Sequence, residues 1–89
     1  MQRIEGFIWE DWVLDKLDWK HGVDPQEVEG AFFNPPYKVR RTGEGKYLLY
    51  GRSESSRHLF IVFVWEAQFV KVITARGMTT TEKRFYGRK

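Results

Sequence analysis

The sequence has no cysteine, and this absence excludes disulfide scaffolds, thiolate zinc sites and a cysteine nucleophile. Long hydrophobic runs are also missing, because the longest, 59–65, has seven residues and is too short to span a bilayer. Glu5, Glu10 and Asp11 interrupt any apolar stretch near the N-terminus, so no signal peptide is expected. We therefore expect a soluble cytoplasmic protein with no membrane partner.

Histidine is scarce, and the motifs of phosphate-binding loops, dinucleotide-binding folds and H-E-x-x-H metalloproteases are absent. The two histidines, His21 and His58, stand 37 positions apart, which gives little support to a metal site or to a Ser-His-Asp triad. We therefore expect neither a metal nor another cofactor.

The chain does contain enough apolar bulk for one small domain over residues 1–89. Hydrophobic residues make up 42% of it and aromatic residues 17%, so a core can form and wholesale disorder is not expected. The net charge of +3 is unevenly divided: residues 1–36 carry 3 basic and 8 acidic side chains, and residues 37–89 carry 12 and 4. The basic half suits a polyanionic partner, either nucleic acid or an acidic protein, or is simply a solvated surface.

The first third of the chain favours helices after a short apolar run, 6–9, that suits a strand. Residues 10–21 are expected to be helical, because apolar side chains recur there at helical spacing. The expected buried stripe contains Trp9, Val13 and Leu17. Trp12 and Trp19 are assigned to the same stripe in preference to a role as base-stacking platforms.

A second helix is expected to begin at Asp24-Pro25-Gln26-Glu27, where Asp24 can cap and Glu27 stands at the reciprocal position of a capping box. Gly22 suits the end of the preceding helix. Asn34-Pro35-Pro36 ends the second helix, because proline cannot continue it.

The remaining chain favours strands, expected at residues 37–42, 46–52, 57–65 and 69–75. The short turns between them predict an antiparallel meander, with the continuously apolar run 57–65 at its centre. Gly77 is expected to break the last strand, and Thr79-x-x-Glu82 to begin a short C-terminal helix. The resulting order, β-α-α-β-β-β-β-α, predicts an α+β fold with two N-terminal helices on one face of a twisted antiparallel sheet.

Basic and aromatic side chains gather at the ends of these elements: Lys20, His21, Arg52, Arg57, His58, Arg76, Lys83, Arg84 and Tyr86. Such a set suits RNA cleavage without a metal. That reaction needs a base for the ribose 2′-OH, cations for the charge of the phosphorane, and an acid for the leaving 5′-oxygen. Arginine suits the second role, because its planar fork binds phosphate oxygens in bidentate fashion.

Each of these residues could instead have a role in the fold alone. Arg76 could pair with a carboxylate, Lys20 and His21 could serve the C-terminus of the first helix, and Arg52 could extend from the core edge. Tyr86 could serve packing alone. Other basic side chains could bind the RNA backbone or only protect an exposed sheet edge: Lys38, Arg40 and Arg41. The residue patterns alone thus indicate a small basic α+β domain that is suited to binding nucleic acid.

Six segments carry a family resemblance over almost the whole chain. They are Phe7-Ile8-Trp9-Glu10, Lys20-His21-Gly22-Val23, Ala31-Phe32-Phe33-Asn34-Pro35-Pro36, Lys46-Tyr47-Leu48-Leu49-Tyr50-Gly51-Arg52-Ser53, Val72-Ile73-Thr74-Ala75-Arg76 and 79–86. In this order they resemble the BrnT toxins of bacterial type II toxin–antitoxin systems, a branch of the RelE/ParE-like group.

The resemblance implies a RelE-like fold and a metal-independent endoribonuclease that arrests growth. It also implies neutralisation by a BrnA-like dimeric DNA-binding antitoxin, through which alone the complex would contact DNA. By motif, Arg76 would stabilise the phosphorane, and Lys20 and His21 would bind substrate or transfer protons. Arg52 would contact phosphate, and Tyr86 would stack or orient. From their charge and position, the remaining candidates are expected to bind RNA: Lys38, Arg40, Arg41, Arg57, His58, Lys83 and Arg84.

Departures from the family pattern keep a second hypothesis open. Leu17 stands where many members have asparagine, Trp65-Glu66-Ala67 where many have Thr-Glu-Arg, and Gly77 where many have a charged residue. These departures favour a non-catalytic basic module that binds the antitoxin or RNA. A third hypothesis, a gyrase-poisoning toxin of the ParE type, fits the fold but not the segment 20–23.

Overall fold

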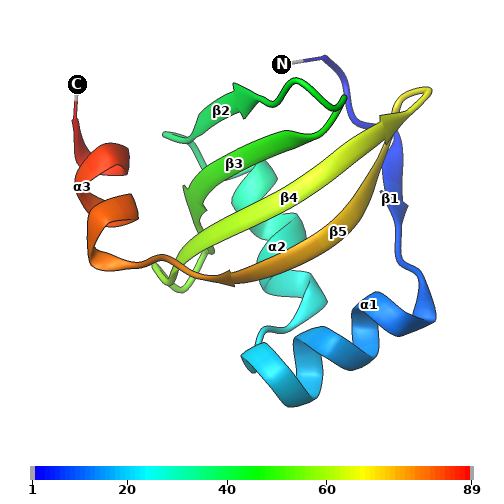
Figure 1. Cartoon of the computed structure of the whole chain (residues 1–89), viewed down its shortest axis with the longest axis horizontal. Helices are drawn as coiled ribbons and strands as arrows, with labels where there is room; N and C mark the ends of the chain where they lie inside the picture. Colours follow the sequence, from blue (N-terminus) through cyan, green and yellow to red (C-terminus); the bar gives the residue numbers. More distant parts are fainter. Residues whose placement is uncertain (1, 89) are drawn as a thin grey trace.

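The computed structural model describes residues 2–88 and contains the elements in the expected order. They are β1 (Gly6–Ile8), α1 (Asp11–Lys16), the π-helical turn η1 (Leu17–His21), α2 (Pro25–Phe32), β2 (Lys38–Arg41), β3 (Tyr47–Arg52), β4 (His58–Glu66), β5 (Phe69–Gly77) and α3 (Thr80–Gly87). Figure 1 shows α2 behind the sheet and α3 beside the end at which β3 and β5 finish. None of the helices in this part of the chain is long and apolar enough to cross a membrane.

The sheet has the strand order β1-β5-β4-β3-β2. Strands β2 to β5 form the expected antiparallel meander, and the apolar strand β4 lies at its centre. β1, however, pairs with β5 in parallel, so the prediction of an entirely antiparallel sheet was wrong. Turn length fixes only the direction of strands that a turn joins, and the helices that follow β1 leave it free to add to the open edge of β5.

Alternation along the strands divides their side chains between two faces of the sheet. Toward α1, η1 and α2, the strands present fully buried apolar side chains: Leu49, Leu59, Ile61, Phe63, Val70, Val72 and Ala75. The helices add Val13, Leu17, Val28, Ala31 and Phe32. We call this side the helix-covered face, and it holds the core of the protein.

Both predicted capping boxes are confirmed. At α2, Asp24 Oδ1 accepts from Gln26 N at 2.7 Å and Glu27 Oε2 accepts from Asp24 N at 3.2 Å. At α3, Thr79 Oγ1 accepts from Glu82 N at 3.2 Å and Glu82 Oε1 accepts from Thr79 N at 2.8 Å. These local contacts satisfy backbone donors that the first turn of a helix leaves free.

The first helix is not uniform, and this changes the position of two tryptophans. Val13 and Leu17 are fully buried as expected, but Trp12 is 52% exposed and Trp19 is 75% exposed. Their assignment to the buried stripe was therefore wrong. Trp12 is the residue before the buried Val13, so its side chain points about a quarter-turn away from the buried stripe. The π-helical turn after Lys16 has a wider winding than an α-helix, and this moves Trp19 out of the stripe.

The end of β5 also differs from the expectation. Gly77 is the last residue of the strand and pairs with Leu59, so β5 continues two residues beyond Ala75. Because glycine is tolerated at a strand end, it did not break the ladder before this point. Arg76 is consequently a strand residue, paired with Phe60 on β4.

Candidate functional site

The second face of the sheet carries charged and aromatic side chains in place of an apolar core. Cross-strand pairing places Lys38, Tyr50, Phe60 and Arg76 in one row across β2, β3, β4 and β5. Two pairs further along, and so on the same face, Arg52 lies opposite His58. We call this surface the basic face, and define it as Lys38, Arg40, Tyr50, Arg52, His58, Phe60 and Arg76. The register thus brings candidate residues from four strands to one surface.

Helix α3 lies over one end of the basic face. The ring of Phe85 packs edge-on against Tyr50 at 4.8 Å, and Lys38 Nζ lies 4.6 Å from the centre of the same ring. Tyr86 donates its hydroxyl proton to the carbonyl of Pro36 at 2.6 Å, and its ring lies 5.7 Å from that of His58. These contacts hold α3 at a fixed place beside the candidate residues.

Arg76 is held on three sides. Its guanidinium lies 4.4 Å above the ring of Phe60, within the range of a cation–π contact. Its Nη1 and Nη2 donate to the two carboxylate oxygens of Glu82 at 2.7 and 2.8 Å, and Nη1 also donates to the carbonyl of Gly77 at 3.1 Å. The carboxylate pairing that the sequence left open as an alternative is therefore present.

The Arg76–Glu82 pair shifts both ionisation equilibria toward the charged forms. Hydrogen bonds from Arg76 lower the pKa of Glu82 below its usual value of 4.5. The same contact raises the pKa of Arg76. The Glu82 side chain is 18% exposed and that of Arg76 is 35% exposed, so the pair lies at the boundary between protein and solvent. Both groups are therefore charged near neutral pH.

His21 is the last residue of η1, which packs beside β5. Burial lowers the pKa of His21 below 6.5, and the charges of Lys20, Lys16 and Arg76 lower it further. A neutral imidazole near pH 7 can accept a proton. Lys20, by contrast, is exposed. The sequence placed both residues at a helix end, and the structure places that end within electrostatic range of Arg76.

Arg52 contributes an unusual atom. Its Nε is the one buried side-chain nitrogen or oxygen within residues 2–88 that lacks a hydrogen-bond partner. A hollow of about 370 Å³ is lined by Arg52 together with Pro36, Tyr37, Lys38, Tyr86, Gly87 and Arg88. Arg52 and Tyr86 therefore share one cavity, although the Tyr86 hydroxyl already donates to a backbone carbonyl.

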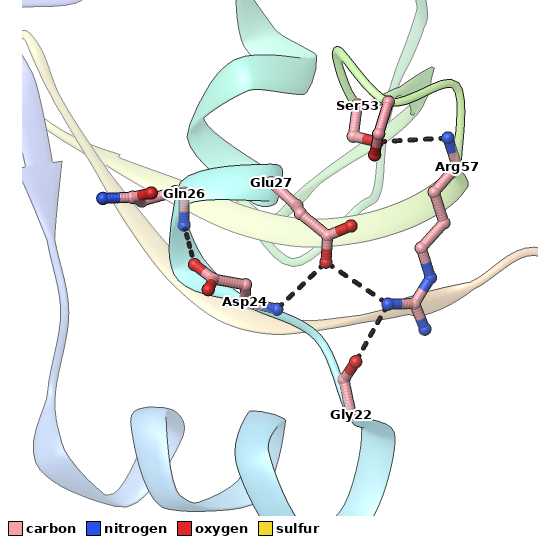
Figure 2. Close-up of polar contacts among 7 residues, drawn as sticks. Gly22, Asp24, Gln26, Glu27, Ser53 and Arg57 are labelled. Atoms are coloured by element: carbon pink, nitrogen blue, oxygen red, sulfur yellow. Dashed lines mark hydrogen bonds and ion pairs between the residues drawn. The ribbon is translucent and has the colours of Figure 1, made fainter.

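Arg57 stands apart from this surface. Its Nη1 donates to the carbonyl of Gly22 at 2.9 Å and to Glu27 Oε2 at 3.3 Å, and its backbone N donates to Ser53 Oγ at 3.1 Å. Figure 2 shows Arg57 reaching from the turn before β4 to the junction between η1 and α2. The structure thus places this candidate in contacts that join elements of the fold.

The remaining candidates divide between two surfaces. Arg84 lines a hollow of about 350 Å³ with Arg40, Tyr50 and other residues of α3, beside the basic face. Lys83 is exposed on the same helix. Arg41 pairs in register with Tyr47 and lies 5.9 Å from the centre of its ring, so it belongs to the opposite face from Lys38 and Arg40. Within residues 2–88 no three carboxylate or imidazole side chains form a group that could hold a metal ion.

Two residues at this site were missed by the sequence reasoning. Glu82 was assigned only to the capping box, and Phe60 only to a central strand. The Thr79-x-x-Glu82 pattern gave the position of Glu82, but nothing in it indicates a second partner six residues upstream. For Phe60, the pairing with Arg76 depends on a register shift between Val62 and Phe63, which moves the ladder by one residue from the register that the β4–β5 turn sets. No residue pattern in the sequence indicated this shift.

Comparisons with known proteins bear on the family and on the fold. Residues 15–82 match the model of a family described as the ribonuclease toxin BrnT of type II toxin–antitoxin systems. The fold is similar to the crystal structure of the Brucella abortus ribonuclease toxin BrnT, with a TM-score of 0.67 and 19% sequence identity. That match covers 84% of this chain and 97% of the other. No curated protein sequence matches the chain.

The family match spans well over half of the chain and includes four of the five catalytic candidates, Lys20, His21, Arg52 and Arg76, together with Glu82. At 19% identity the solved structure bears on the fold alone, and there it agrees: an α+β domain with a five-stranded mixed sheet and three α-helices. On the strength of the family match, the chain belongs to the BrnT family of ribonuclease toxins of type II toxin–antitoxin systems.

Proposed function

We propose that this protein is a metal-independent endoribonuclease of the BrnT family that cleaves RNA by attack of the ribose 2′-oxygen on the neighbouring phosphorus. The 2′-OH loses its proton to a base, the P–O5′ bond breaks, and the leaving 5′-oxygen gains a proton from an acid. The products are a 2′,3′-cyclic phosphate, which can open to a 3′-phosphate, and a 5′-hydroxyl end. The chain's own cations stabilise the additional negative charge of the phosphorane.

The observation that carries this proposal is the position of Arg76. Its guanidinium is fixed by Phe60 below and Glu82 beside it, and it lies on a surface with two other cationic strand residues, Lys38 and Arg52. A cation that does not need to reorganise as charge develops is the feature that makes such stabilisation effective. We assign the charge of the phosphorane to Arg76 first and to Arg52 second.

We assign proton transfer to a residue of η1, which packs beside β5. His21 is the better candidate for the base, because its lowered pKa leaves the imidazole neutral near pH 7. Lys20, an exposed cation, suits substrate binding. Tyr86 suits orientation or stacking, since its hydroxyl proton is donated to Pro36. We assign further phosphate contacts along the RNA to Arg40, His58, Lys83 and Arg84. Arg41 and Arg57 are left out of this set, because they lie outside the basic face.

The same proposal extends to the cellular role. We place residues 1–89 in one RelE-like toxin domain that acts in the cytoplasm and arrests growth by cutting RNA. The family implies an antitoxin partner and an RNA target. We propose that this antitoxin is a BrnA-like dimeric DNA-binding protein, and that the toxin meets DNA only through their complex. The positive charge of the basic face suits both an RNA and an acidic antitoxin segment.

The test is RNA cleavage by the purified protein without added metal, with the new 3′ ends mapped. Wild type is expected to leave cyclic or 3′-phosphate ends, and Arg76→Ala to lower kcat/KM by about 10²–10³-fold. Arg41→Ala is the matched control, because it removes an arginine from the same sheet but from the opposite face. Absence of cleavage, even with ribosomes present, or full activity of a folded Arg76→Ala protein would contradict the proposal.

A further inference from the structure

The Arg76 side chain offers a specific pattern of used and free donors. A guanidinium has five N–H donors. Both donors of Nη1 are used, by Glu82 Oε1 and by the Gly77 carbonyl, and one donor of Nη2 is used by Glu82 Oε2. Within residues 2–88 no partner is present for the second Nη2 donor or for Nε, and Nε is not one of the buried side-chain atoms that lack a partner.

The two free donors lie on the same edge of the guanidinium. Nε–H and the outer Nη2–H point in parallel from the side of the fork, and this edge can bind two oxygens of one phosphate. Glu82 occupies the other bidentate edge, formed by Nη1 and Nη2. The carboxylate thus fixes the rotation of the guanidinium and leaves the edge that matches a phosphate open.

Glu82 is itself rigidly placed. Its Oε1 accepts from Thr79 N at 2.8 Å as part of the capping box, and its backbone N donates to Thr79 Oγ1. The side chain is 18% exposed. Contacts of Phe85 with Tyr50 and of Tyr86 with Pro36 fix the helix that carries Glu82. A carboxylate held by its own helix can therefore hold a strand arginine in one orientation.

We propose that Glu82 is a positioning residue for RNA cleavage, and that it turns the Nε/Nη2 edge of Arg76 toward the scissile phosphate. The inference rests on the proposed role of Arg76 and deepens it. Because Arg76 is assigned to the charge of the phosphorane, loss of its orientation should act on kcat more than on KM. A small misplacement of a reacting group costs up to about 10²-fold in rate.

The experiment compares four proteins in the same cleavage assay: wild type, Glu82→Gln, Arg76→Ala and the double variant. Glu82→Gln keeps the size of the side chain but loses the second carboxylate oxygen. We expect it to lower kcat by about 10–10²-fold with little change in KM. If Glu82 acts through Arg76, the double variant should be no slower than Arg76→Ala alone.

The variant Thr79→Ala separates a loss of stability in α3 from a loss of Arg76 orientation. This variant removes the capping hydroxyl and destabilises the start of the helix by about 1 kcal/mol, but leaves both carboxylate–guanidinium hydrogen bonds in place. We expect it to keep the wild-type kcat. A loss in Thr79→Ala as large as in Glu82→Gln would overturn the positioning role and assign the effect to helix stability.

A second readout does not depend on cleavage. In wild type, the Arg76 Nε–H should give a sharp and restricted NMR resonance, and Glu82→Gln should broaden it. An unchanged resonance, an unchanged kcat in Glu82→Gln, a faster Glu82→Gln enzyme or independent losses in the double variant would each overturn the inference while the role of Arg76 stands. A fully active Arg76→Ala protein would instead overturn both, so the two failures are distinguishable.

Discussion

Phe63 and Phe60 lie three residues apart on β4 and on opposite faces of the sheet, and their surroundings differ. Phe63 is fully buried on the helix-covered face, edge-on to Phe32 at 5.0 Å and stacked on Tyr47 at 5.6 Å. Phe60 is only partly buried on the basic face and supports the guanidinium of Arg76. The same residue type thus completes a core on one face and forms the base of a charged site on the other.

This difference teaches how so small a chain can combine a stable fold with a charged surface. The apolar contacts are concentrated on the helix-covered face, where two helices exclude water from the strands. On the basic face, among the described residues, α3 covers one end, and the Arg76 side chain there stays 35% exposed and available to a ligand. Substitutions on the two faces should accordingly separate stability from activity.

The largest expected effect tests that separation on one strand. Phe63→Ala removes a fully buried ring and should lower the free energy of unfolding by about 3–5 kcal/mol. Phe60→Ala should cost only about 1–2 kcal/mol, because this ring is partly buried, yet it should slow RNA cleavage by releasing Arg76. Denaturant unfolding and cleavage rates measured on both variants check this. Equal loss of stability at the two positions would contradict the division between the faces.

A smaller effect is expected from the arginine that joins elements of the helix-covered face. Arg57→Ala removes hydrogen bonds to Gly22 and Glu27 and should cost about 1 kcal/mol, since both side chains are partly exposed. Because Arg57 lies outside the basic face, its loss should leave KM for RNA unchanged. Arg40→Ala is the matched control, with the opposite pattern of unchanged stability and raised KM. A raised KM in Arg57→Ala would return this residue to the proposed RNA-binding surface.

Much of this fold could be predicted from the sequence, because much of it is locally determined. The capping boxes at Asp24 and Thr79 need only four consecutive residues, and the apolar run of β4 identifies the central strand without its neighbours. The parallel pairing of β1 with β5 could not be predicted in this way, because no turn joins the two strands. The exposure of Trp19 depends on a π-helical turn that apolar spacing does not reveal.

The candidate site shows the same limit. The sequence identified Arg76, Arg52 and His21 as chemically suitable. Arg52 and Arg76 lie near one end of the sheet, and His21 ends η1, which packs beside β5. Their partners, however, are set by tertiary contacts. The pairing of Arg76 with Glu82 depends on the path of the chain from β5 to α3, and the contacts of Arg57 depend on the junction between η1 and α2.

The pH dependence of stability sharpens the comparison at the Arg76–Glu82 pair. Hydrogen bonds from Arg76 lower the pKa of Glu82 in the folded state, so its stabilising contribution is present above about pH 4.5 and is lost as the pH falls through the lowered value. We expect the pair to contribute about 0.5–1 kcal/mol to the free energy of unfolding, because Arg76 stays partly exposed and solvent weakens the interaction. The difference in Tm between wild type and Glu82→Gln should therefore shrink on acidification. A difference independent of pH would show that the pair contributes no such linkage.

The smallest effect is expected at Trp19, the most exposed large apolar side chain among the described residues. At 75% exposure its ring gains little from folding, so Trp19→Ala should change the free energy of unfolding by less than about 0.5 kcal/mol. Trp9→Ala is the contrasting variant, because Trp9 packs against the core and donates its Nε1 proton to Glu29 at 2.7 Å. Denaturant midpoints of the two variants compare them directly. A substantial loss in Trp19→Ala would mean that this ring is buried in solution, and that the helical register first expected from the sequence holds there after all.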